Sequence, residues 1–244
     1  MTEKLSSDEL LKIEWFDRNF SEVKENIAKV CAEIGKNVDD IILLAATKTV
    51  PAAVINHAMD EGIGFIGENR VQEFLSKKDD LKTTAHRHFI GHLQTNKVKD
   101  IVDEVEMIES VHSVKLAKEI DKQCKSCGKV MEILLEVNIG GEESKSGFTP
   151  QEVVSAAEEI AKMPNVSVKG LMTIPPICEP KEKSSEYFAQ MYKLFIDIRD
   201  KKLDNVNILY LSMGMSGDYV EAIRNGANII RLGTCLFGQR IYNH

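Results

Sequence analysis

One lysine stands where an amine could do chemistry. In "IILLAATKTVP", residues 41–51, six apolar residues lead through Thr47 to Lys48. Such a strand either simply reaches water at the lysine or carries the amine to the mouth of a buried site. In a partly desolvated site the pKa of the amine falls, and the amine becomes a better nucleophile toward carbonyl carbon.

Two glycine-bearing segments near the C-terminus have residue types suited to an anion. "SMGMSGD" (212–218) offers the hydroxyl of Ser216 and leads into a predicted helix at 217–225, whose first N–H groups lack partners. "RLGT" (231–234) contains Gly233, which lets a backbone approach an anion closely. The simpler interpretation of the first segment is an ordinary turn in which Ser216 or Asp218 caps the helix.

Arg231 interrupts the otherwise apolar "NIIRLGT" (228–234). A guanidinium keeps its charge and is costly to bury without a partner. It therefore pairs with a carboxylate or donates to a ligand acceptor, such as a ring nitrogen or a phosphate. A nucleophilic lysine beside a phosphate site indicates a phosphorylated carbonyl compound, which is either a sugar phosphate or pyridoxal 5'-phosphate (PLP).

The elements that must position these residues alternate along the chain. Short apolar, β-branched runs predict strands at 41–47, 63–67, 87–91, 105–110, 129–138, 166–173, 206–213 and 228–234. Helical patterns fill the intervals at 51–61, 69–78, 94–102, 113–125, 150–162, 183–202 and 217–225. This alternation predicts an α/β fold, a (β/α)8 TIM-type barrel, in which the carboxyl ends of the strands form the site. An open, doubly wound sheet is the alternative, although it more often has about five to seven strands.

An extra amphipathic helix is predicted ahead of the barrel, at 6–34. Ser6 and Glu9 have the spacing of a capping box, and Gly35 ends the pattern. The apolar face of this helix is interpreted as a packing surface without a chemical role. Because no linker or change of composition divides the chain, we expect residues 1–244 to form one domain.

Three other patterns are interpreted as structural. "GIGFIG" (62–67) matches a dinucleotide fingerprint, but a predicted strand lies inside it rather than before it. "CKSC" (124–127) lacks a second pair for zinc and closes a helical pattern instead of opening one. His86, His88 and His92 have no acidic or cysteine partner at ligand spacing, so we expect no metal site, and we place His92 at the rim of the pocket.

Bulk properties exclude some classes of function. A net charge of -7 and a pI near 5.5 argue against nucleic acid as a partner. The first thirty residues contain charges throughout, and no apolar run approaches the roughly 18–20 residues needed to span a bilayer. The five cysteines are scattered, as expected of reduced thiols. We therefore expect a cytoplasmic protein that does not bind membranes.

Seven segments, in order from about residue 43 to 240, together resemble the YggS/PROSC family of PLP-binding proteins, which is similar in fold to the barrel domain of alanine racemase. They are "ATKTVP", "GENRVQEF", "HFIGHLQTNK", "VNIGGEESKSGF", "GLMTIPP", "LSMGMSGDYVEAI" and "IRLGTCLFGQR". The resemblance implies that Lys48 carries PLP as an internal aldimine, and that Ser216 and the amides of Met215, Gly233 and Thr234 hold the phosphate. It also implies that Arg231 faces the pyridine nitrogen and that Asn69 lies beside the ring.

The resemblance implies a carrier or buffer of PLP in vitamin B6 homeostasis rather than an enzyme, with apo-forms of PLP enzymes as recipients. An arginine at the ring nitrogen weakens the cofactor as an electron sink. The sequence closes with "FGQRIYNH" soon after Thr234, so we expect no second domain to cover the site. The alternatives are a PLP-dependent racemase or lyase, for which Tyr210 is the nearest second base, and an aldolase acting on a sugar phosphate. Lys145 is interpreted as a solvated lysine of a loop, 139–148, that either closes over the ring or stays open.

Overall fold

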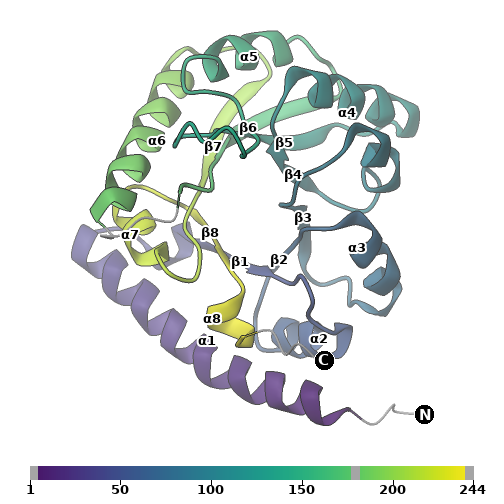
Figure 1. The fold of residues 1–244 in the computed structure, drawn as a ribbon, viewed down its shortest axis with the longest axis vertical. Coiled ribbons are helices and arrows are strands. Elements are labelled where there is room, and N and C mark those ends of the chain that lie inside the picture. The colour runs from purple at the N-terminus through teal and green to yellow at the C-terminus, as the bar shows by residue number, and fades with distance from the viewer. Residues whose placement is uncertain (1–4, 177–181, 240–244) are drawn as a thin grey trace.

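The computed structural model describes residues 5–176 and 182–239, which form a closed barrel of parallel strands. Each strand pairs with the next along the chain, and the last pairs with the first, so that Leu44 lies opposite Arg231. The strands are β1 (Ile42–Ala46), β2 (Phe65–Glu68), β3 (His86–Phe89), β4 (Met107–Val111), β5 (Met131–Glu136), β6 (Val166–Met172), β7 (Val206–Ser212) and β8 (Ile229–Leu232). Figure 1 shows the helices surrounding this barrel. The predicted (β/α)8 barrel is confirmed.

The connecting helices follow the predicted pattern except at 94–102 and 217–225, and a short helix after the last strand was not predicted. They are α2 (Ala52–Asp60), α3 (Val71–Lys77), α4 (Val114–Cys127), α5 (Val153–Ile160), α6 (Glu182–Asp200), α7 (Tyr219–Arg224) and α8 (Thr234–Phe237), with 3-10 turns η1 (Val38–Asp40), η2 (Lys78–Asp80) and η3 (Thr95–Asp100). The α-helix predicted at 94–102 is wrong, because η3 occupies that segment and buries only Val98, too little for an apolar stripe. The helix predicted at 217–225 is shorter than expected, since α7 has six residues.

The N-terminal helix α1 (Ser7–Ile34) lies outside the barrel, across α2, α7 and α8 (Figure 1). Ser6 and Glu9 form the predicted capping box, and Gly35 closes the helix at φ 68°. On α8, Asn19 Nδ2 donates to the carbonyl of Leu236 over 3.1 Å. The helix therefore has a fixed register against the chain that follows β8.

The barrel interior has an apolar floor with polar residues above it. The floor consists of six side chains from six strands or strand ends: Leu44, Ile90, Met107, Leu134, Met172 and Ile229. Gly67 leaves room for this packing, because a Cβ there would lie 2.3 Å from the Leu44 side chain. Side chains alternate along a strand, so residues two positions after Met107, Leu134 and Ile229 also face inward, nearer the carboxyl ends. The polar side chains of Glu109, Glu136 and Arg231 therefore lie between this floor and the carboxyl ends of the strands.

Within residues 5–176 and 182–239, no helix has both the length and the apolar character required to cross a membrane.

Candidate functional site

A cavity of about 290 Å³ lies at the carboxyl ends of the neighbouring strands β1 and β8. Its lining brings together six of the seven residues that the sequence predicts for cofactor binding: Lys48, Met215, Ser216, Arg231, Gly233 and Thr234. A larger cavity, of about 630 Å³, adjoins α6 and α7, but Arg224 in its lining is already paired with Glu33 and Glu221. The smaller cavity is therefore the better candidate for chemistry.

Lys48 follows β1 and is exposed at the rim of the cavity. The partly desolvated amine that the sequence predicts at this position stays a prediction. The next residue, Thr49, has a φ of 62°, a left-handed conformation that is rare for a β-branched residue. Such strain persists where the surroundings impose it, and here it shapes the turn that presents Lys48.

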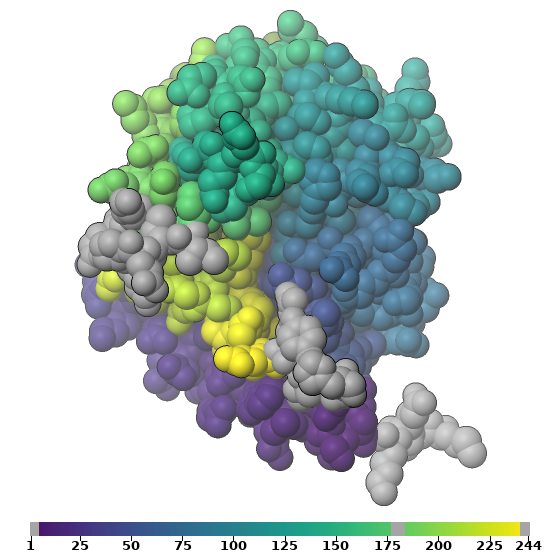
Figure 2. Space-filling view, in the orientation of Figure 1, coloured from purple at the N-terminus to yellow at the C-terminus, as the bar shows by residue number. Residues whose placement is uncertain are grey.

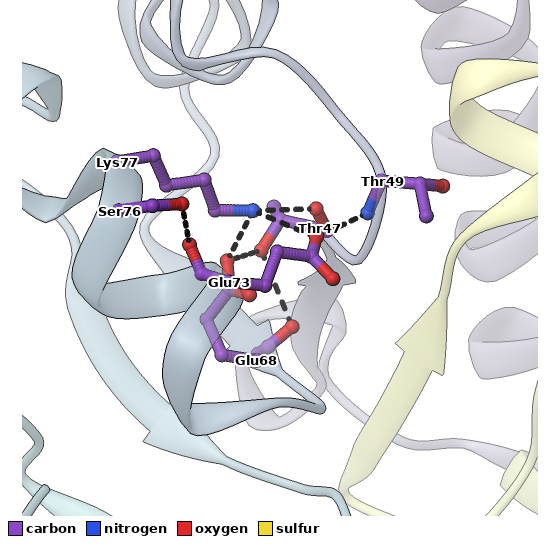
Figure 3. A network of polar contacts seen from close by, with 7 residues as sticks. Thr47, Thr49, Glu68, Glu73, Ser76 and Lys77 are labelled. Atoms are coloured by element: carbon purple, nitrogen blue, oxygen red, sulfur yellow. Dashed lines mark hydrogen bonds and ion pairs between the residues drawn. The ribbon is translucent and has the colours of Figure 1, made fainter.

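Side chains from β2 and α3 hold the residues on both sides of Lys48 (Figure 3). The Thr47 hydroxyl donates to Glu68, and Lys77 Nζ donates to the carbonyl of Thr47 over 2.9 Å. On the other side, the N–H of Thr49 donates to Glu73. Lys77 Nζ also lies 2.9 Å from Glu68, whose pKa is raised chiefly by burial. This cluster fixes the turn while the Lys48 side chain stays accessible.

The loop after β7 and the start of α8 supply unused donors to the same cavity. Among the described residues, no acceptor is bonded to the backbone N–H groups of Ser216, Gly217, Gly233 and Thr234. The N–H of Cys235 donates to Ser216 Oγ over 3.1 Å, so the hydroxyl proton of Ser216 remains available as a donor. Ser216 and Gly233 are half-buried, whereas Gly217 and Thr234 are exposed. Neighbouring backbone amides without partners suit an anion.

Met215 lines the cavity, but its N–H is already engaged, because it donates to Asp218 Oδ1 over 2.7 Å. Asp218 is the N-cap of α7 and makes no side-chain bond to the helix itself. The loop is tied to β8, since the N–H of Arg231 donates to the carbonyl of Gly214 over 3.0 Å. Only one of the two capping residues that the sequence offered therefore occupies the cap position.

Arg231 is buried, with 4% of its surface exposed, and projects inward from β8. Its Nη1 donates to Ser212 Oγ over 2.5 Å, and its Nη2 donates to the carbonyl of Thr173 over 2.7 Å. Ser212 in turn donates to Glu109 Oε2 over 2.6 Å. The sequence left open whether Arg231 pairs with a carboxylate or donates to a ligand. Within the described residues, Arg231 forms no direct ion pair with a carboxylate. It reaches Glu109 through a hydroxyl instead.

Glu109, Arg231 and Glu136 also have shifted pKa values. Burial raises the pKa of Glu109, but the hydrogen bond and charge of His88, 2.7 Å away, and the charge of Arg231 outweigh it and lower that pKa. Burial also lowers the pKa of Arg231, an effect opposed by Glu109 and Glu136. The pKa of Glu136, at the end of β5, is raised to about 7 by burial, with Arg231 opposing the rise.

Asn69, the seventh predicted residue, follows β2 and is half-buried, outside the lining of the cavity. Its Oδ1 is buried without a hydrogen-bond partner among the described residues. Gly91 packs directly on the Asn69 backbone, since a Cβ at Gly91 would lie 2.0 Å from the Asn69 carbonyl oxygen. The side chain thus carries an unused acceptor on the β2 side of the barrel mouth.

Other residues singled out in the sequence lie elsewhere. His92 Nδ1 is 3.0 Å from Ser146 Oγ, and Lys145 donates to the carbonyl of Pro175 over 3.2 Å and pairs with Glu142. Cys124 is buried, and its pKa is raised to about 11, chiefly by burial, which leaves it an inert thiol. Cys178 lies outside the described residues.

One charged residue of the lining was missed from the sequence. Lys12, on α1, lines the cavity and is buried. A signal was present, because Lys12 occupies the position four residues before Phe16 on the same buried stripe, where an apolar residue is expected.

The fold and the site together define a (β/α)8-barrel protein with a lysine amine beside two loops that carry unused backbone donors. A family model described as "Alanine racemase, N-terminal domain" matches residues 19–241. The chain is 44% identical over 223 residues to the Aquifex aeolicus protein named "Pyridoxal phosphate homeostasis protein", covering 91% of this chain and 97% of that protein. The Escherichia coli K12 protein of the same name is 31% identical, covering 92% and 97%. The chain therefore belongs to the alanine racemase N-terminal domain family and, within it, to the pyridoxal phosphate homeostasis proteins.

Solved structures agree with the assignment. PipY of Synechococcus elongatus PCC7942 with PLP bound has a TM-score of 0.76 and 30% identity, covering 87% of this chain and all of that one. An alanine racemase of Clostridium difficile has a TM-score of 0.74 at 17% identity, covering 94% of this chain and 58% of that chain. The second likeness shows the shared fold alone.

Proposed function

We propose that this protein binds PLP through Lys48 and acts in vitamin B6 homeostasis as a carrier or buffer of the cofactor. The observation that carries the proposal is one cavity in which the Lys48 amine, four unused backbone donors and the buried Arg231 come together. The names of the relatives and the PLP bound to PipY support it.

The residues in and beside the cavity fit the parts of PLP. The N–H groups of Gly217, Gly233 and Thr234 and the hydroxyl of Ser216 suit a phosphate group. The N–H of Met215 is spent on Asp218, so we propose a supporting role for this residue in the shape of the loop. The unused Oδ1 of Asn69 is an acceptor that a ring substituent would satisfy.

When bound, PLP supplies an aldehyde that forms a carbon–nitrogen double bond with a primary amine, with the loss of one water molecule. Lys48 would supply that amine from the rim of the cavity, where its side chain is exposed to solvent and to small molecules in it. Arg231 keeps its charge, so its proposed place at the ring nitrogen holds that nitrogen unprotonated. These properties suit storage and release of an aldehyde better than the stabilisation of a carbanion.

The racemase or lyase alternative needs an acid or base on the second face of the cofactor. Tyr210, the nearest candidate that the sequence offers although it is not at a strand end, packs against the apolar floor of the barrel. That position supports the carrier proposal. Lys48 lies at an exposed rim rather than in a water-excluding enclosure, which also supports a carrier.

Several expectations accompany the proposal. We propose that the chain acts as one domain with α1 packed on the barrel, that apo-forms of PLP enzymes receive the cofactor, and that the protein works in the cytoplasm without nucleic acid or membrane partners. The net charge of -7 supports the absence of nucleic acid. The free thiols of Cys31, Cys124, Cys127 and Cys235 support a reducing compartment.

The test is a PLP titration of the purified protein, followed by its visible absorbance. We expect a band in the wild type and in Lys193→Ala, which removes an exposed lysine of α6, and no band in Lys48→Ala. A wild type that stays colourless would overturn the proposal. Multiple turnover of any D- or L-amino acid by the loaded protein would overturn the carrier role and support the racemase or lyase.

A further inference from the structure

Lys12 is a buried cation in the wall of the candidate cavity. It lies on α1, with 9% of its surface exposed, and it lines the cavity together with Ser216, Gly233 and Thr234. It comes from a region of the chain that precedes the part matched by the family model, residues 19–241. The family match therefore assigns it no role.

Aromatic packing fixes where Lys12 stands. One turn after it along α1, Trp15 covers Gly238, where a Cβ would lie 2.0 Å from the indole ring. Phe16 stacks on Phe237 with 5.6 Å between ring centroids. Figures 1 and 2 show α1 in purple running directly beside α8 in yellow. These aromatic contacts therefore hold the turn of α1 that bears Lys12 beside the cavity.

The ammonium of Lys12 has no carboxylate within ion-pair distance among residues 5–176 and 182–239. Its Nζ lies 6.0 Å from the centroid of the Trp15 ring, at the outer limit of a cation–π contact. Burial lowers its pKa, and the charge of Asp8, one turn earlier, only opposes this at longer range. A desolvated charge without a partner is costly, and an anion in the cavity removes that cost.

We propose that Lys12 is an additional anion-binding residue of this cavity, which pairs with the phosphate of a phosphate monoester held by Ser216, Gly233 and Thr234. The nature of the monoester rests on the proposed function, in which it is PLP. The anion site itself rests on the buried ammonium, which has no ion-pair partner among the described residues, and on the unused donors that line the same cavity. Loop amides and a hydroxyl are neutral, so Lys12 adds a full positive charge to the phosphate end of the site.

This charge gives the site a means of selection. A phosphate group carries close to two negative charges near neutral pH, whereas an alcohol at the same position carries none. Lys12 therefore favours phosphorylated ligands over their dephosphorylated forms. The expected preference is for PLP over pyridoxal, which has the same aldehyde but no phosphate.

The experiment measures the dissociation constants of PLP and pyridoxal for four proteins: wild type, Lys12→Gln, Lys12→Arg and Lys29→Gln. Lys29 is an exposed lysine on the same helix, so its replacement makes the same change of net charge away from the cavity. Loss of one charge-assisted hydrogen bond is expected to weaken PLP binding by Lys12→Gln roughly 10- to 100-fold. Pyridoxal binding should stay unchanged, Lys12→Arg should recover most of the affinity for PLP, and Lys29→Gln should match the wild type.

Calorimetric titration with inorganic phosphate separates this proposal from the proposed function. If the wild type gives the visible band with PLP but Lys12→Gln keeps the full preference for PLP over pyridoxal, the Lys12 proposal is overturned and the carrier proposal stands. The Lys12 proposal is equally overturned if Lys29→Gln loses as much affinity as Lys12→Gln. If the wild type binds no PLP, heat of phosphate binding that Lys12→Gln abolishes still supports the anion site. Absence of that heat in the wild type then overturns it.

Discussion

The guanidinium of Arg231 donates to the hydroxyl of Ser212 over 2.5 Å, and through this hydroxyl it is linked to a carboxylate on the opposite side of the barrel. Ser212 donates to Glu109, and Glu109 Oε1 lies 2.7 Å from His88 Nδ1. The four residues come from β8, β7, β4 and β3. A buried polar chain of this kind holds each member in one orientation, and here it aims Arg231 toward the cavity.

Ser212→Ala should both destabilise the protein and weaken cofactor binding. The substitution leaves a guanidinium donor and a carboxylate acceptor without partners in the interior, at an expected cost of about 1–3 kcal/mol in the free energy of unfolding. Denaturant unfolding measures this cost, and a PLP titration measures the binding. Ser110→Ala is the matched control, because Ser110 is also a buried serine at a strand end and donates to the carbonyl of Gly91 over 2.5 Å, away from Arg231. Equal loss of PLP affinity in both variants would contradict a specific role for Ser212.

Glu73→Ala should loosen the turn that presents Lys48. The N–H of Thr49 then loses its carboxylate acceptor, while Lys77 keeps its contact with Glu68. We expect a loss of about 1 kcal/mol in the free energy of unfolding and weaker PLP binding, because the left-handed turn at Thr49 is no longer imposed. The exposed Gln72 on the same helix provides the control variant Gln72→Ala. PLP binding unchanged in Glu73→Ala would show that the turn does not need this carboxylate.

Gly91→Ala should disturb the β2 side of the barrel mouth. Its Cβ would lie 2.0 Å from the carbonyl oxygen of Asn69, so the backbone that carries this predicted cofactor residue must move. Overpacking of this kind costs about 1–3 kcal/mol, and we expect lower PLP affinity as well. Gly64→Ala, just before β2, is the matched control, since a Cβ there meets nothing within 4 Å. Thermal or denaturant unfolding of both variants checks the prediction, and equal stabilities would contradict it.

Most of the fold could be predicted from the sequence because its signals are local. Apolar runs of strand length alternate with helical stripes, and the capping box at Ser6 and the glycine at 35 mark both ends of α1. Where the local signal was weak, as at η3, the prediction of an α-helix was wrong.

The site could be predicted only in part, because its partners meet through barrel register. Ser212 and Glu109 are 103 residues apart in the chain, and the sequence around one does not predict a contact with the other. The engagement of the Met215 amide by Asp218 depends on the exact course of a loop. Lys12 was overlooked for a different reason: the whole buried stripe of α1 was interpreted as packing, although a lysine occupies its first buried position.

Glu136 should make the stability of the protein depend on pH in the neutral range. Its pKa is raised from 4.5 to about 7, chiefly by burial, and although the residue as a whole is half-buried, its Oε2 is fully buried without a partner among the described residues. The folded state therefore binds more protons than the unfolded state between these two values. By linkage, the contribution of Glu136 to stability is fully present below pH 4.5 and is lost as the pH rises through about 7.

Glu136→Gln removes this titration. At about pH 8 the variant should be more stable than the wild type by on the order of 2–3 kcal/mol, and the difference should shrink toward about pH 5. Denaturant unfolding across this range gives the difference directly. Glu132→Gln is the control, because Glu132 lies on the same face of β5 at the other end of the strand and pairs with Lys169. A difference between wild type and Glu136→Gln that does not change with pH would show that the Glu136 carboxyl is already ionised throughout the range, as an unburied carboxyl would be.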